Sequence, residues 1–174
     1  MLSKEEITAT AASAIFGKPL ITNVYRSIVV EAIIAAALPD WRWVSADYFE
    51  YDFVHADGTR LEVKQSALKQ TWVTKGDAKP SWDVAERKGA WKDGKWVPSP
   101  GRNADIYVLG LHDVIDETAD HRDPAQWQFL VIPTSKLPTT ARISLGPASR
   151  LANPVTVSGL PAAVAEARDK AGRP

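Results

Sequence analysis

The segment 23–38 constrains the fold most, because it reads as a helix that is apolar nearly all round. Its second half has the sequence VVEAIIAAAL, in which Glu31 is the only charge, and Pro39 ends it. A helix of this kind is normally packed on most of its sides. Strand-like segments follow it at residues 41–45, 47–54, 59–66, 81–85, 104–111 and 126–133. We therefore expect one α/β domain over residues 1–174, with a mixed β-sheet flanked by helices.

Local sequence signals predict where helices begin and where the chain turns. Ser3 and Glu6 form a capping-box pattern that starts a helix at about Lys4. Thr22 or Asn23 can cap the helix 23–38. A last helix is expected over residues 158–171, with a proline in its first turn. Residues 88–103 are rich in glycine and proline and predict a hairpin or a long loop.

Composition excludes several classes of protein. The chain has no cysteine, which excludes disulfides, thiolate zinc sites and a cysteine nucleophile. No apolar run reaches the roughly 18 residues of a membrane span, and the polar start has no signal-peptide core, so we expect a cytoplasmic protein with no membrane partner. Neither glycine-rich phosphate-loop motif occurs, so no nucleotide cofactor is expected.

Charge and tryptophan are unevenly distributed. The chain balances 21 Lys+Arg against 21 Asp+Glu, which by itself gives no support to a nucleic-acid partner. Residues 60–102, however, hold ten basic and five acidic residues, whereas residues 103–127 hold one basic and six acidic residues. Four of the seven tryptophans lie in the basic segment, where they can stack on bases or cover a small core: Trp72, Trp82, Trp91 and Trp96. The other three are expected in the core: Trp41, Trp43 and Trp127.

A possible catalytic pattern lies in the expected hairpin of residues 47–66. Glu62 and Lys64 are two residues apart on one strand and point to the same face. The turn decides where Asp52 points. A two-residue turn pairs Asp52 with Val63, whereas a three-residue turn with a left-handed Gly58 pairs it with Glu62.

In the second register Glu50 also faces Lys64, and several charges share one face of the hairpin. Neighbouring acidic residues repel each other unless a cation lies between them. Carboxylate oxygens suit Mg²⁺ or Mn²⁺. Glu31, on an apolar helix, would be costly to bury alone, so it either contacts such a metal, Lys64 or Arg26, or faces solvent. An exposed strand with a simple ion pair remains the alternative.

Two further groups are given structural roles. The three histidines have no metal-ligand spacing and are expected on the surface: His55, His112 and His121. Asp105 follows Arg102 at the start of a strand, where the two can form a buried ion pair.

The order of these residues resembles that of the PD-(D/E)XK nuclease superfamily. Glu31 lies in the early helix, Asp52 in the first hairpin strand, and Glu62-Val63-Lys64 in the second. Segments 61–72 and 102–108 extend the resemblance, which covers about residues 20–135 and looks like an uncharacterised bacterial branch. The chain departs from the pattern where Tyr51, not proline, precedes Asp52, so Asp47 and Glu50 are rivals for that role.

The resemblance implies a restriction-endonuclease-like fold and Mg²⁺-dependent hydrolysis of phosphodiester bonds in DNA. It implies metal ligands at Asp52, Glu62, the carbonyl of Val63, and Glu31. Lys64 would orient water or stabilise charge, and Gln65 would position water or a phosphate. The basic segment is expected to contact phosphates through Lys69, Lys75, Lys79, Arg87 and Arg102. Many such enzymes dimerise to cut both strands, so a homodimer is an option.

Two other functions are compatible with the sequence. The chain can be a nuclease-fold module that binds DNA without cutting it. It can also be an α/β protein-interaction domain whose tryptophans serve core and interface. The second alternative predicts that the side chains of Asp52, Glu62 and Lys64 do not converge.

Overall fold

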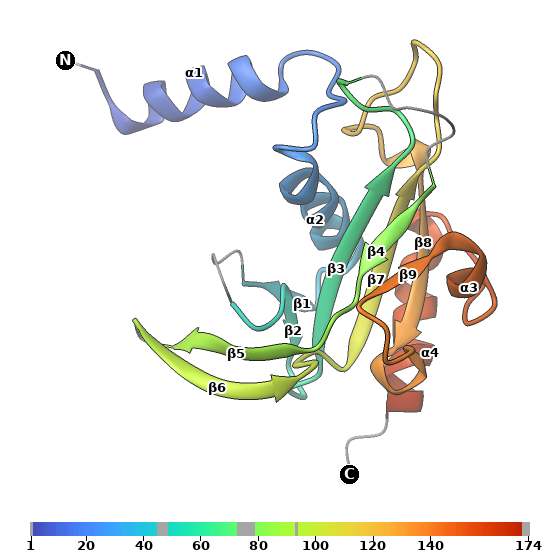
Figure 1. Cartoon of the computed structure of the whole chain (residues 1–174). Coiled ribbons are helices and arrows are strands. Elements are labelled where there is room, and N and C mark those ends of the chain that lie inside the picture. Colours follow the sequence, from blue (N-terminus) through green and yellow to red (C-terminus); the bar gives the residue numbers. More distant parts are fainter. Residues whose placement is uncertain (1, 45–48, 73–78, 93, 172–174) are drawn as a thin grey trace.

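The central sheet is mixed, as the sequence predicts. The structure is a computed structural model that describes residues 2–44, 49–72, 79–92 and 94–171. The sheet has the strand order β1-β2-β3-β7-β8 (Figure 1). β3 and β7 run parallel, and every other neighbouring pair is antiparallel. The strands span Trp41–Trp43 (β1), Phe53–His55 (β2), Arg60–Ala67 (β3), Ile106–His112 (β7) and Trp127–Pro133 (β8).

Two helices cover one face of this sheet. α2 (Arg26–Ala37) packs on β1 and β3, and α4 (Leu160–Ala171) packs on β7 and β8. The alternation of β3 puts Leu61 and Val63 into the core beneath α2. The approach of α2 is close, since a Cβ on Gly110 of β7 would lie 3.3 Å from both Val30 and Trp127. Glu62 and Lys64 are therefore left on the opposite face.

That opposite face is covered only in part. β4 (Ser81–Asp83), β9 (Arg142–Ser144) and α3 (Leu145–Ser149) close a second core over β7 and β8. Trp82 is 1% exposed there and donates its indole N–H to the carbonyl of Gly110 at 2.9 Å. Of the four tryptophans in the basic segment, Trp82 is thus a core residue.

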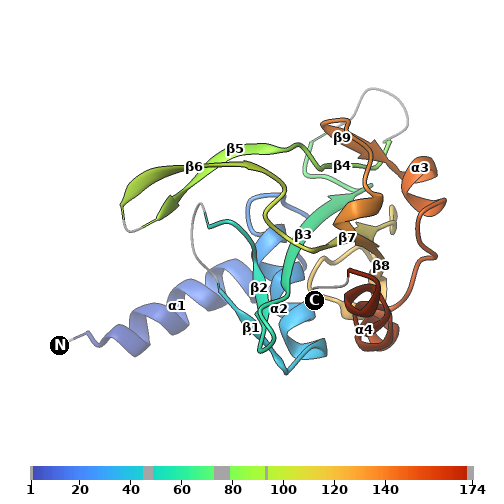
Figure 2. The same ribbon diagram turned by 90° about the horizontal axis from the view of Figure 1, so that it is seen from below.

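Two elements project away from the sheet. β5 (Arg87–Lys92) and β6 (Lys95–Gly101) form a hairpin, one of the two alternatives expected for residues 88–103, and we call it the arm (Figures 1 and 2). α1 (Lys4–Phe16) begins with the predicted capping box at Ser3 and has no buried residue. Short 3-10 turns span Pro124–Gln126, Thr134–Lys136 and Val157–Gly159. Within the described residues, no helix is long and apolar enough to cross a membrane.

The expectation for segment 23–38 was partly wrong. α2 begins later, at Arg26, and the cap residue Tyr25 makes no side-chain cap, so neither proposed polar cap is used. The helix buries one stripe that includes Val30 and Ile34, whereas Ile28 is 36% exposed. Apolar residues therefore occur on several sides of α2, but only one side of the helix is buried. β2 is also shorter than the expected strand 47–54, of which residues 47 and 48 lie outside the described residues.

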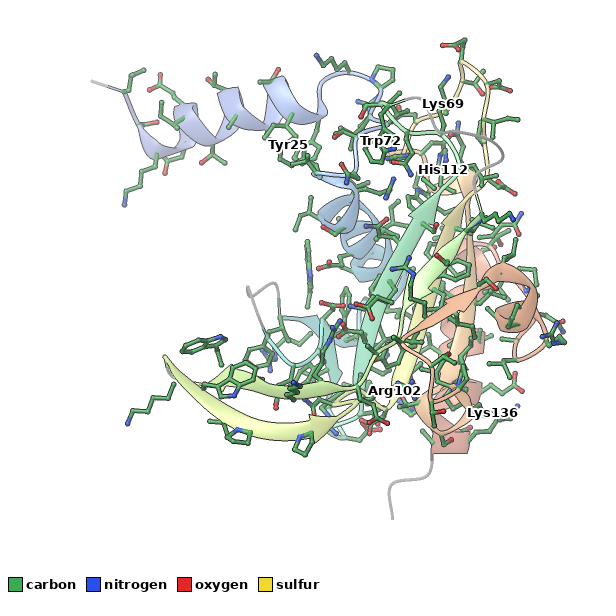
Figure 3. The ribbon with its side chains drawn as sticks, viewed as in Figure 1. Tyr25, Lys69, Trp72, Arg102, His112 and Lys136 are labelled. Carbon is green, nitrogen blue, oxygen red and sulfur yellow. The ribbon has the colours of Figure 1, made fainter. Side chains whose placement is uncertain are left out.

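Two histidines are in the core, contrary to the surface position expected of them. His112, at the end of β7 (Figure 3), and His121 are fully buried, with ring centroids 4.7 Å apart. Neither ring nitrogen of His121 has a hydrogen-bond partner within the described residues. Burial lowers the pKa of His112 and lowers that of His121 to about 4, with His112 and Arg26 adding repulsion at His121.

This pair predicts a specific loss of stability in acid. Between about pH 6.5 and pH 4 the unfolded chain binds a proton at His121 that the folded chain excludes, so the free energy of unfolding falls as pH falls. The variant His121→Gln removes this contribution. Urea unfolding at pH 7.5, 6 and 5 should show the wild type losing more stability than the variant. Parallel losses in both proteins would contradict the assignment.

Candidate active site

The turn between β2 and β3 has three residues, which decides the register. His55 N–H donates to Thr59 O at 2.9 Å, and Gly58 has a φ of 84° in the left-handed region. Phe53 lies opposite Leu61 in the ladder. Extending that register by one residue puts Asp52 opposite Glu62. The second of the two registers left open by the sequence is therefore the one adopted.

Asp52 lies immediately before β2 and is tied to β3. Its N–H donates to Leu61 O at 3.0 Å, and its Oδ2 accepts the N–H of Val63 at 2.6 Å. The N–H and C=O of one residue in an extended strand face the same neighbour. The carbonyl of Val63 therefore faces the edge of β3 on which Asp52 lies.

Glu62 and Lys64 form an ion pair on the partly covered face of β3. Their side chains are only 16% and 24% exposed. The pKa of Glu62 is raised to about 7, mainly by burial and also by the charge of Asp52, while Lys64 opposes the shift. Burial also raises the pKa of Asp52, against the hydrogen bond from Val63. Both carboxyl groups are thus held where ionisation is costly.

Glu31 approaches the same charges from α2. Its Oε2 accepts a hydrogen bond from the indole N–H of Trp43 at 2.9 Å. Burial, and then the charge of Asp52, raise its pKa, whereas Lys64 lowers it. The cost of burying the Glu31 carboxylate is therefore offset by the hydrogen bond from Trp43. The ion pair with Lys64 or Arg26 that was one expectation is not formed. Three acidic groups influence one another around a single lysine.

The donor set is smaller than the four ligands expected. Across the described ranges, no group of three or more His, Cys, Asp or Glu side chains could hold a metal ion. Asp52 and Glu62 remain as two carboxylates on facing positions, with the carbonyl of Val63 beside them. Asp52 Oδ1 and Glu62 Oε2 accept no hydrogen bond from the described residues. Two such oxygens and a carbonyl fit a hard divalent cation that keeps several waters, as Mg²⁺ does.

The ion pair opens into a cavity of about 500 Å³ beneath the arm. Trp91 and Trp96 line it from the arm, where they lie opposite each other with ring centroids 5.9 Å apart, and each is 50% exposed. Tyr107 lines it beside Glu62, and its pKa is raised to about 12, mainly by burial, so its O–H stays available as a donor. Sequence reasoning did not assign this aromatic wall to the site, although tryptophans among basic residues were its signal.

The five expected phosphate contacts fall into three groups. Arg87 lines the cavity, and Lys79 is exposed. Lys69, at the far end of β3, donates to Asp116 O at 2.6 Å, and Arg102, at the base of the arm, donates to the carbonyl of Val84 at 2.6 Å (Figure 3). The side chains of Lys69 and Arg102 are therefore engaged in hydrogen bonds within the protein. Lys75 lies outside the described residues.

Three further candidate site residues remain: Glu50, Asp47 and Gln65. Glu50 lines the cavity beside Lys64, whereas its rival Asp47 lies outside the described residues. Gln65 points away from Lys64, because neighbouring residues of a strand face opposite sides, and it accepts a hydrogen bond from Arg26 Nε.

Arg102 does not form the expected ion pair with Asp105, which pairs with Arg60. Asp105 Oδ2 instead accepts from the backbone N–H of Arg60 at 2.8 Å and lies 3.5 Å from Arg60 Nε. The guanidinium of Arg102 donates to backbone carbonyls.

Known proteins give no further guide to this site. A comparison with models of known protein families finds no match to the chain, and a comparison with curated proteins finds no significantly similar sequence. The functional argument therefore rests on the residues and their geometry.

The raised pKa of Glu62 predicts a pH-dependent cost to the metal-free fold. Between about pH 4.5 and pH 7 the folded chain retains a proton at Glu62 that the unfolded chain releases, so the free energy of unfolding falls as pH rises through this window. In EDTA, the stability of Glu62→Gln relative to wild type should increase from pH 5 to pH 8, by at most about 1.4 kcal/mol per unit of pKa shift. A constant difference, measured by urea unfolding, would contradict burial of this carboxyl.

Proposed function

We propose that the chain is a metal-dependent deoxyribonuclease with a restriction-endonuclease-like fold, related to the PD-(D/E)XK nucleases. One observation carries the proposal. Asp52, immediately before β2, lies opposite Glu62 of β3 when the register is extended by one residue, with Lys64 paired to Glu62 and the carbonyl of Val63 on the edge beside Asp52. Raised pKa values at both carboxyl groups mark a site where a cation would be stabilising.

The chemistry follows from what these residues can do. Asp52, Glu62 and the carbonyl of Val63 would hold Mg²⁺ or Mn²⁺. When bound, such a cation neutralises charge on the phosphate and lowers the pKa of a coordinated water. Lys64 supplies a positive charge next to the carboxylates, suited to stabilise negative charge that develops on a phosphate oxygen. Glu31, fixed by Trp43, adds negative charge that increases the attraction for the cation.

The arm supports a nucleic-acid substrate. Trp91 and Trp96 expose half of their surface in the cavity that contains Glu62 and Lys64. Exposed indoles provide stacking surfaces for bases, each base contributing about 1–3 kcal/mol. Lys88 and Lys95 are exposed on the same hairpin, where they can attract phosphates. A strand of DNA lying between arm and sheet would have its backbone near Lys64.

A DNA-binding module without catalysis is the second candidate. It is favoured by the absence, within the described residues, of a cluster of three metal-ligating side chains. It predicts salt-dependent binding of DNA and no cleavage in either Mg²⁺ or Mn²⁺.

Cleavage assays separate the two functions. Wild type, Lys64→Ala and Asp52→Asn are incubated with single-stranded, double-stranded and branched DNA in Mn²⁺. We expect wild type to cleave at least one substrate, and each variant to lose about 10²-fold or more in rate, because each loses charge stabilisation at the phosphate.

The matched control is Lys88→Ala, which removes an exposed lysine from the arm. It should weaken binding and retain most of the cleavage rate at saturating DNA. Equal cleavage by wild type and Lys64→Ala would assign the activity to a contaminant. Binding by wild type without cleavage would establish the second candidate.

A further inference from the structure

A second pocket, of about 330 Å³, lies at the opposite end of β3 from the arm. Among the described residues, its charged lining is cationic and consists of Arg26, Lys79 and Arg142. Gln65, Gln70 and Trp72 also line this pocket.

Arg26 is the unusual member of this set, because it is a nearly buried cation with no acidic partner among the described residues. Arg26 is only 7% exposed. Nε donates to Gln65, and Nη1 donates to Gln70 Oε1 at 2.9 Å, so both acceptors are neutral amides. No described Asp or Glu lies within ion-pair distance of it, and its Nη2 makes no hydrogen bond within the described residues.

Burying a charge in this way is costly unless an ion compensates it. Burial lowers the pKa of Arg26 below its usual value, yet a guanidinium stays protonated in proteins. Two surface cations, Lys79 and Arg142, add to the positive charge instead of neutralising it. The pocket therefore has the chemistry of an anion site, and planar guanidinium groups match phosphate oxygens in particular.

β3 connects this pocket to the candidate active site. Lys64 lines the first cavity, and Gln65 and Ser66 line the second. From Lys64 to Ser66 the strand advances about 7 Å, so the two cavities are close enough for one DNA strand to contact both. β2 pairs only with Arg60 and Leu61, so among the described residues the rest of that edge of β3 has no strand beside it. A DNA strand can therefore follow this edge from one pocket to the other.

We propose that Arg26, Lys79 and Arg142 bind a phosphate group of the DNA strand close to the bond to be cut. The identity of this ligand as DNA rests on the proposed function, whereas the preference for phosphate rests on the pocket. The phosphate is either an internal phosphodiester or a terminal phosphate monoester. A terminal phosphate would fix the distance between the strand end and the cleavage position.

The test uses the full chain in EDTA, so that cleavage plays no part. Inorganic phosphate is compared with chloride at equal ionic strength by thermal melting. Single-stranded oligonucleotides carrying a 5′-phosphate, a 3′-phosphate or hydroxyl ends are compared by fluorescence anisotropy. The variants are Lys79→Ala and Arg142→Ala, which remove exposed side chains, with Arg150→Ala as the exposed control outside the pocket.

Phosphate should raise the melting temperature of wild type and Arg150→Ala, and raise it less in the two pocket variants. Each pocket variant should lose roughly tenfold in DNA affinity, and its salt slope should fall by about one, which a purely structural role would not cause. An advantage of phosphorylated ends that is lost in the variants assigns the pocket to a terminal phosphate. Equal weakening for all three oligonucleotides assigns it to an internal phosphodiester.

The inference fails if the pocket variants bind phosphate and DNA as wild type does. This result is distinct from failure of the proposed function. Manganese-dependent cleavage with unchanged phosphate binding would refute the pocket alone. A phosphate response that disappears in the pocket variants, in a protein that neither binds nor cuts DNA, would support the phosphate site and refute the nuclease.

Discussion

The three-residue turn that contains Gly58 controls the candidate site, because it sets the register of β2 against β3. In this register Asp52 lies opposite Glu62, and its carboxylate reaches the N–H of Val63. A slip of one residue would turn Asp52 towards the apolar core under α2 and separate it from Glu62. A left-handed glycine thus determines whether two acidic side chains share a face.

The consequence is a local excess of negative charge in partly buried surroundings. Glu31, Asp52 and Glu62 each have a raised pKa, and Lys64 is the cation that opposes all three shifts. A fold selected only for stability would gain from replacing one of these acids. The arrangement becomes favourable when a divalent cation balances the charge. At the other end of β3, Arg26 presents the opposite imbalance, a buried cation with no acid beside it among the described residues, which the proposed phosphate would balance.

The sequence predicted the elements well but their orientation less well. The capping box at Ser3, the arm and the buried β7 followed from local patterns. The turn length could not be chosen, because Ala56-Asp57-Gly58 and Asp57-Gly58 are both good hairpin turns. The buried face of α2 was misjudged because apolar residues lie on several sides of the helix, and only contact with the sheet buries Val30 and leaves Ile28 exposed.

Charged and aromatic residues were harder to assign, since their roles depend on contacts distant in sequence. Trp82 packs in the core while Trp91 and Trp96 face the cavity, although all three lie in one basic segment. Arg102 is bound to backbone carbonyls of other segments, and His121 is enclosed with His112 despite lying in an acidic loop. No local pattern distinguishes these cases.

Direct measurement of Mn²⁺ binding tests the central claim, that two facing carboxylates share one divalent cation. Isothermal titration calorimetry would compare wild type with Asp52→Asn and Glu62→Gln, and with Glu86→Gln as an exposed control. The account predicts saturable binding by wild type and the control, and loss of that binding in both site variants. Wild type that binds no Mn²⁺, or site variants that bind it as tightly as wild type, would contradict the account.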